Sequence, residues 1–233
     1  MAKIFAFFNQ AGGVGKTTLV MNLGYHLAKR PSRVLLVDMD PQASLTLFMG
    51  IDPREVPCTV HEALATRAKL SVNIDIHRMS LAPANPNTDE FEEQLLREGD
   101  FEVLRRELAE VSGDYDYILI DCPPSKSINS KIALTAADFI VIPVTTEFKG
   151  LAGTDQVLDT IAQVKRRFNS QLAIAAIVPT MFDGRTRQHR MSLEDLEEGL
   201  KTVAPISPPI PKGIAFADAS SLQIPLSQYD PRH

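Results

Sequence analysis

Glycines near the N-terminus are spaced as in a loop that holds phosphate groups. The segment Gly12-Gly13-Val14-Gly15-Lys16-Thr17-Thr18 follows an apolar run and opens a stretch with helical periodicity. Glycines let backbone N–H groups curl around phosphate oxygens, and the following helix directs its positive dipole end at the same anion. Lys16 can reach the β- and γ-phosphates, and the Thr17 hydroxyl suits Mg²⁺. The pattern predicts a P-loop that binds ATP with Mg²⁺; the alternative is a glycine-rich turn with an unrelated lysine.

Two aspartates stand where a P-loop protein needs carboxylates. Asp38 ends the apolar run VLLVD and Asp121 ends the run YILID. In an open α/β sheet, ligands bind at the carboxyl ends of strands, so both side chains should point into the nucleotide crevice. A carboxylate in this place typically holds Mg²⁺, which predicts metal-site roles for Thr17, Asp38 and Asp121. The alternative for either aspartate is a helix or turn cap.

Apolar strands alternate with helical stretches along the whole chain. Strands are expected at 3–8, 34–38, 76–82, 117–121, 139–144 and 172–178, and helices at 17–30, 88–111, 127–137, 151–169 and 188–203. Near-continuous apolar strands separated by helices predict a mostly parallel, twisted sheet covered by helices on both faces. The proline-rich stretch 205–211 is expected to be a loop ahead of a short irregular tail. The fold class is therefore α/β, in a single domain spanning 1–233.

Composition excludes several other classes. The 233 residues are 44% hydrophobic and 23% charged, as in a soluble globular protein. No apolar run approaches the roughly 18 residues of a membrane span. Two cysteines, Cys58 and Cys122, do not suggest a disulfide framework or a zinc site, so the cytoplasm is expected.

Positive charge gathers late in a chain whose net charge is −5. A basic stripe on an acidic body can bind a polyanion locally. Two alternatives stay open: Lys165, Arg166 and Arg167 could simply end a helix, where the helix dipole favours positive charge, and Arg185 could lie inside the fold. The expected DNA-binding residues are Lys165, Arg166, Arg167, Arg185, Arg187 and Arg190.

Five segments, in order, resemble the ParA/MinD family of positioning ATPases. Asn9-Gln10 ahead of the glycine loop resembles the family's deviant phosphate loop, which lacks the usual first glycine at position 10. The segments 37–44, 117–125, 180–187 and 218–225 resemble its switch, its Walker B strand end and two late segments of the ParA branch.

The resemblance implies slow, partner-stimulated ATP hydrolysis, with Lys16 as a catalytic residue and Asp38 positioning or activating the attacking water. It also implies a homodimer that sandwiches ATP, non-specific DNA binding on the nucleoid, and a cargo adaptor protein. The cargo stays open between plasmid, chromosome origin, chemosensory cluster and carboxysome. The expected nucleotide contacts are Ala11, Gly12, Gly13, Val14, Gly15, Lys16, Thr17, Thr18, Met181 and Pro211.

One position departs from the family pattern. Ala11 stands where the family normally has a lysine that reaches the partner subunit's nucleotide. A subgroup similar to the carboxysome-positioning ATPase McdA also lacks this lysine. Lys149, just after the expected strand 139–144, is the predicted replacement in the catalytic site, with Lys126 in reserve; the alternative is a solvated surface lysine.

The same fold also serves two other functions. An iron–sulfur ATPase of the nitrogenase-reductase type would need two cluster cysteines, and neither Cys58 nor Cys122 matches their positions. The other is an ATP-dependent ligase or amidase-type synthase. Membrane attachment is not expected, because the tail 226–233 is short, holds a proline and has no apolar face.

Overall fold

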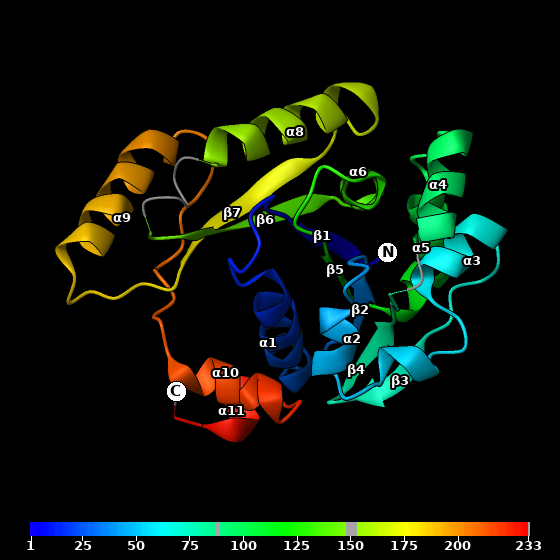
Figure 1. The fold of residues 1–233 in the computed structure, drawn as a ribbon, viewed down its shortest axis with the longest axis horizontal. Helices are drawn as coiled ribbons and strands as arrows, with labels where there is room; N and C mark the ends of the chain where they lie inside the picture. The colour runs from blue at the N-terminus through cyan, green and yellow to red at the C-terminus, as the bar shows by residue number, and fades with distance from the viewer. Residues whose placement is uncertain (87–88, 148–152, 233) are drawn as a thin grey trace.

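A twisted sheet of seven strands lies at the centre of the molecule (Figure 1). The computed structural model describes residues 1–86, 89–147 and 153–232. The strand order is β3-β4-β2-β5-β1-β6-β7, and every neighbouring pair is parallel except the antiparallel β3 and β4. The strands are β1 (Lys3–Phe7), β2 (Val34–Asp38), β3 (Asn73–Ile76), β4 (Met79–Ala82), β5 (Tyr117–Asp121), β6 (Phe139–Thr145) and β7 (Ala173–Thr180).

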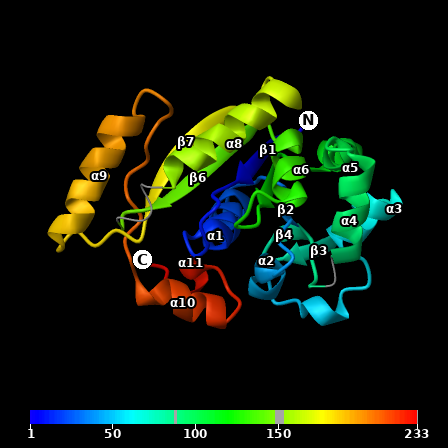
Figure 2. The same ribbon diagram turned by 45° about the horizontal axis from the view of Figure 1, so that its top comes forward.

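Helices cover both faces of this sheet (Figure 2). The longer ones are α1 (Lys16–Lys29), α4 (Asp89–Glu98), α5 (Val103–Val111), α6 (Ile128–Ala136), α8 (Thr154–Arg167), α9 (Arg187–Leu200) and α10 (Ile214–Ser221). The shorter ones are α2 (Ser44–Phe48), α3 (Val60–Thr66) and α11 (Leu226–Tyr229), with 3-10 turns at Pro53–Glu55 and Ser112–Asp114.

Alternation along the central strand divides the core into two layers. Ile118 and Ile120 of β5 belong to the apolar cluster that includes residues of α4, α5, α6 and α8. Leu119 between them belongs to the opposite cluster, which includes residues of α1 and α2. A strand with buried residues on both faces requires a helix layer on each side. The predicted α/β fold with a mostly parallel sheet is confirmed.

Three local predictions are wrong. The expected strand 76–82 is a hairpin, because His77 and Arg78 both adopt positive φ and turn β3 back onto β4. The expected helix 88–111 is two helices, because Gly99 leaves the helical region at φ 65 between α4 and α5. The expected irregular tail contains α10 and α11.

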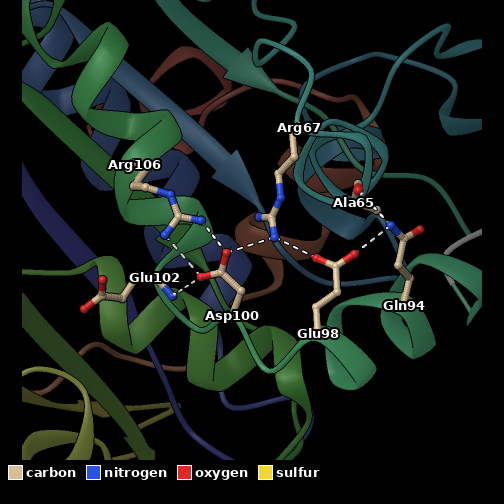
Figure 3. Close-up of polar contacts among 7 residues, drawn as sticks. All are labelled: Ala65, Arg67, Gln94, Glu98, Asp100, Glu102 and Arg106. Carbon is tan, nitrogen blue, oxygen red and sulfur yellow. Dashed lines mark hydrogen bonds and ion pairs between the residues drawn. The ribbon is translucent and has the colours of Figure 1, made fainter.

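A network of ion pairs and hydrogen bonds connects α3, α4 and α5 (Figure 3). Arg67, just after α3, lies 2.6 Å from Glu98 of α4 and 2.9 Å from Asp100. Arg106 of α5 reaches the same Asp100, and Gln94 of α4 donates to the carbonyl of Ala65 in α3. Partly exposed pairs contribute at most about 1 kcal/mol each, so the network mainly fixes how α3, α4 and α5 meet.

Candidate functional site

The phosphate loop leaves the carboxyl end of β1 and turns into α1. Gly13 and Gly15 have φ of +73° and +91°, which side chains rarely adopt. A Cβ built at Gly12 or Gly13 would meet no atom within 4 Å, so this part of the loop faces open space. Gly15 caps α1 without a side-chain hydrogen bond, and no acidic residue occupies the first turn. The first N–H groups of α1 are therefore available to an anion.

Lys16 lies folded against its own loop. Its side chain is 6% exposed, and its Nζ donates to the backbone carbonyls of Asn9 and Ala11, each at 3.0 Å. Burial lowers the pKa of Lys16, and the nearby Asp121 carboxylate offsets part of that shift. Two of the three donors of this ammonium group are therefore used within the loop itself.

Thr17 and Asp121 form a pair of oxygen donors at the start of α1. Thr17 Oγ1 donates to Asp121 Oδ2 at 2.6 Å, and Asp121 Oδ1 is buried without a hydrogen-bond partner. Burial and the charge of Asp38 raise the pKa of Asp121 well above its usual value. An orphaned buried carboxylate oxygen beside a hydroxyl fits Mg²⁺, which takes few protein oxygens and keeps several waters.

Asp38 is held by a residue that sequence reasoning missed. Thr46 of α2 donates to Asp38 Oδ2 from its backbone N–H at 2.9 Å and from its hydroxyl at 2.7 Å. The N–H of Asp40 donates to Asp38 Oδ1 at 3.2 Å. Asp38 and Asp121 occupy matching positions on the neighbouring strands β2 and β5, as predicted from their runs. Burial raises the pKa of Asp38 to about 7, although the bonds from Thr46 and Asp40 oppose the shift.

A cavity of about 620 Å³ opens beside the loop, between α1 and the segment that includes α10 and α11. Its walls include Gly15 and Thr18 at the phosphate end, and the predicted nucleotide contacts Met181 and Pro211. Met181 has φ 56, in the left-handed region, directly after β7. Most of the wall is apolar, which suits a planar base next to the phosphate loop.

Two further side chains fix the loop to the sheet. Asn9 Nδ2 donates to the carbonyl of Pro143 in β6 at 2.7 Å, and Asn9 Oδ1 accepts from the N–H of Ala11 at 2.9 Å. Thr180 Oγ1, at the end of β7, donates to the carbonyl of Val14 at 3.0 Å. In the sequence, Asn9 stood out only as part of the segment ahead of the glycine loop, and Thr180 only as the first residue of the segment 180–187.

The six predicted DNA-contacting cations do not form one patch. Lys165, Arg166 and Arg167 are exposed in the last turn of α8, before β7 begins. The other three follow the opposite end of β7 at the start of α9. Arg185 there is paired with Asp183, and Arg190 donates to the carbonyl of Gly184.

The remaining candidates are placed as follows. Lys149 lies outside the described residues, and Lys126 is exposed after β5. Cys122 is fully buried, with a thiol pKa raised by burial, and Cys58 is partly buried. Neither cysteine position favours an iron–sulfur cluster at a subunit surface. In the described residues, no helix has the length and apolar character that a membrane crossing requires.

Comparisons with known proteins agree with this geometry. Residues 2–174 match a family model described as an AAA domain. The sporulation initiation inhibitor protein Soj of Bacillus subtilis is 38% identical, covering 100% of this chain and 93% of the relative. The chromosome-partitioning ATPase Soj of Treponema pallidum is 36% identical, covering 99% and 91%.

Solved structures with the same fold fall into more than one functional class. Cobyrinic acid a,c-diamide synthase from Mycobacterium smegmatis, with bound ADP and magnesium, superposes with a TM-score of 0.86 at 36% identity, over 100% of this chain and 97% of that one. Apo McdA from Cyanothece superposes with a TM-score of 0.89 at 25% identity, over 98% and 93%. On the domain match and the full-length relatives, the chain belongs to the ParA/MinD family of AAA-domain proteins, in the branch of Soj and ParA.

Proposed function

We propose that this protein binds ATP with Mg²⁺ and hydrolyses it slowly. The observation that carries the proposal is the open loop at Gly12–Gly15, with Lys16 beside it and an unpartnered Asp121 oxygen next to Thr17. Two similar proteins support it, since the Treponema pallidum relative is an ATPase and the Mycobacterium smegmatis structure holds ADP with magnesium.

The side chains divide the work between binding and water positioning. The loop N–H groups and Lys16 receive the phosphates, and Thr17 with Asp121 would hold Mg²⁺, which neutralises phosphate charge when bound. We assign Asp38, which Thr46 fixes, the role of orienting the attacking water; its position at the end of β2 beside Asp121 supports this role. Water positioning and charge neutralisation are what phosphoryl transfer to water requires.

The biological role that fits is positioning of a cargo on the nucleoid. In this proposal the ATP-bound form is a face-to-face homodimer that binds DNA without sequence preference, and an adaptor on the cargo stimulates hydrolysis. The partitioning function in the name of the Treponema relative and the McdA neighbour support it. With Ala11 in the loop, a cation elsewhere, Lys149 or Lys126, offsets the charge of two apposed nucleotides.

An ATP-dependent amidation is the second candidate. One observation favours it: the Mycobacterium smegmatis structure described as a diamide synthase covers all of this chain at 36% identity. A synthase would release ADP only when its small-molecule substrate is present. A positioning ATPase would turn over without one and respond to DNA and its adaptor.

For DNA, the basic end of α8 is the stronger of the two groups. Its three cations are exposed, and none takes part in an ion pair within the described residues. Arg185 at the other group already has Asp183 as its partner. Sequence-indifferent binding arises from phosphate contacts of this kind and is steeply salt-dependent.

Gel shifts with unrelated DNA fragments test this role in the Asp38→Ala protein, which should retain ATP. With ATP, we expect the protein to bind DNA and to sediment as a dimer. With ADP, we expect neither DNA binding nor a dimer. Affinity should fall by at least about 10-fold between roughly 50 and 200 mM salt.

Charge removal then locates the surface. Lys165→Ala with Arg166→Ala and Arg167→Ala should weaken DNA binding more than Arg187→Ala with Arg190→Ala. The control pair Lys69→Ala with Arg97→Ala removes two exposed cations elsewhere and should have little effect. Equal DNA binding in ADP and ATP, or unchanged binding by the α8 variant, would remove this surface from the proposal.

A further inference from the structure

The side chain of Gln10 joins the phosphate loop to α8. Gln10 Nε2 donates to the backbone carbonyl of Gln156 at 2.9 Å and to Thr160 Oγ1 at 2.8 Å. Thr160 Oγ1 in turn donates to the same Gln156 carbonyl at 3.0 Å. The Gln10 side chain thus contacts residues about 150 positions away in the sequence. Gln10 directly precedes Ala11 in the loop.

The backbone on either side of Gln10 is engaged by Lys16. The carbonyls of Asn9 and Ala11, which flank Gln10, each accept from Lys16 Nζ at 3.0 Å. Asn9 is anchored to β6 through Pro143, so the chain before Gln10 is fixed to the sheet. Ala11 is exposed and has no such anchor to another element in the described contacts. A displacement of Lys16 therefore acts first on the peptide groups that carry Gln10.

A nucleotide in the loop would compete for Lys16. The ammonium group has three donors, and two are now spent on backbone carbonyls. A phosphate is a stronger partner for an ammonium group than a neutral carbonyl, since both members of the bond are then charged. We expect that a phosphate bound through the third donor shifts Lys16 and so weakens or redirects its bonds to the carbonyls of Asn9 and Ala11.

We propose that Gln10 is a positioning residue that transmits the occupancy of the phosphate loop to α8. The inference rests on the proposed ATP binding, and it explains how a distant group of cations can respond to nucleotide. Thr160 lies seven residues, roughly 10 Å along the helix, before Arg167. A shift or stiffening of α8 at Thr160 is therefore delivered to Lys165, Arg166 and Arg167 as one rigid element.

Hydrogen exchange of the α8 amides, measured by mass spectrometry, tests the link without DNA. The full-length wild type is compared with and without a non-hydrolysable ATP analogue and Mg²⁺. We expect the analogue to change α8 exchange by at least about fivefold, the equivalent of one to two hydrogen bonds. Gln10→Met, which keeps the length and loses both donors, should reduce this change to less than about twofold while analogue affinity stays within about threefold.

Thr160 provides matched controls on the helix side of the contact. Thr160→Val keeps the shape and removes the hydroxyl, so it should reduce the analogue-dependent change, but less than Gln10→Met does, because Gln10 still donates to the Gln156 carbonyl. Thr160→Ser keeps the hydroxyl and should behave like wild type. A purely structural role for Gln10 would alter α8 exchange equally with and without the analogue, and that result would overturn the proposal. Wild-type protein that binds the analogue without any change in the exchange of its α8 amides would also overturn the proposal. If the wild-type protein does not bind the analogue at all, the proposed nucleotide site is refuted instead.

Discussion

At the scale of single residues, burial of the Asp38 carboxyl lowers the stability of the protein at neutral and higher pH. The carboxyl is fully buried, and burial raises its pKa from 3.8 to about 7. Because the folded state holds this proton more tightly than the unfolded chain, the stability that Asp38 contributes is complete below about pH 4. It is lost as pH rises through about 7, where the folded carboxyl ionises.

Asp38→Asn should therefore stabilise the ligand-free protein at pH 8. The amide keeps an acceptor for Thr46 and removes the buried charge, so we expect a gain of roughly 1 to 4 kcal/mol at pH 8 and little change at pH 4. Denaturant unfolding at both pH values measures it. Asp116→Asn is the control, since Asp116 is exposed and its bonds to Arg33 lower its pKa. An Asp38→Asn protein no more stable than wild type at pH 8 would show that its burial is not costly.

Motif spacing and sheet topology were enough to place the charged residues of the site. Lys16, Thr17, Asp38 and Asp121 meet at one edge because parallel strands end there. Their contact with a nucleotide stays a prediction, as do the roles of Met181, Pro211 and Lys149. The hydrogen bonds of Thr46, Asn9 and Gln10 could not be foreseen, although Asn9 and Gln10 belong to the segment that resembles the family's loop, because each bond depends on how separate elements pack. A single sequence does not show which side chains come into contact when the elements pack.

At the scale of elements, the packing of α1 on the sheet depends on one glycine. A Cβ at Gly24 would lie 2.8 Å from Leu36 Cδ2 of β2 and 2.8 Å from Met79 Sδ of β4. Both atoms belong to buried side chains, so they have little room to move. The close approach sets the distance between α1 and the sheet, and α1 begins at the phosphate loop.

Gly24→Ala should destabilise the protein by about 1 to 3 kcal/mol, because overpacking outweighs the gain in helix propensity. Gly199→Ala is the matched change in α9, where an added Cβ meets nothing within 4 Å. There the same substitution should be neutral or stabilise by up to about 1 kcal/mol. Thermal unfolding of the two variants decides between them. Shifts of the same sign and size would mean that α1 does not pack as closely as described.

The three wrong element predictions have different local causes. His77 and Arg78 make a hairpin turn at positive φ without glycine or asparagine. The apolar pattern therefore gave no sign of the turn and predicted one continuous strand. Gly99 did carry a break signal between α4 and α5, but the apolar pattern continues on both sides. The short helices α10 and α11 follow a proline-rich stretch, whose composition favours a loop over helices.

At the scale of the whole molecule, strand β7 separates two groups of basic residues that lie close together in the sequence. Lys165 to Arg190 is a short stretch of chain, yet the eight residues of β7 run between its two basic groups. At about 3.3 Å per residue, this strand puts roughly 25 Å between the end of α8 and the start of α9. Charge counting along the sequence cannot reveal that separation. The α8 group consequently needs a structural link to the nucleotide, which Gln10 provides in our proposal.

ADP release by the purified protein, with ATP and Mg²⁺ and no other substrate, tests the central claim most directly. The wild-type protein should hydrolyse ATP slowly by itself. Hydrolysis should be faster when DNA and the adaptor protein are present. Lys16→Ala should bind no nucleotide, and Asp38→Ala should bind ATP yet release ADP at least about 100-fold more slowly, because the water is no longer positioned. Release by Asp38→Ala at the wild-type rate, or release by wild type only after a small-molecule substrate is added, would contradict the assignment as a positioning ATPase.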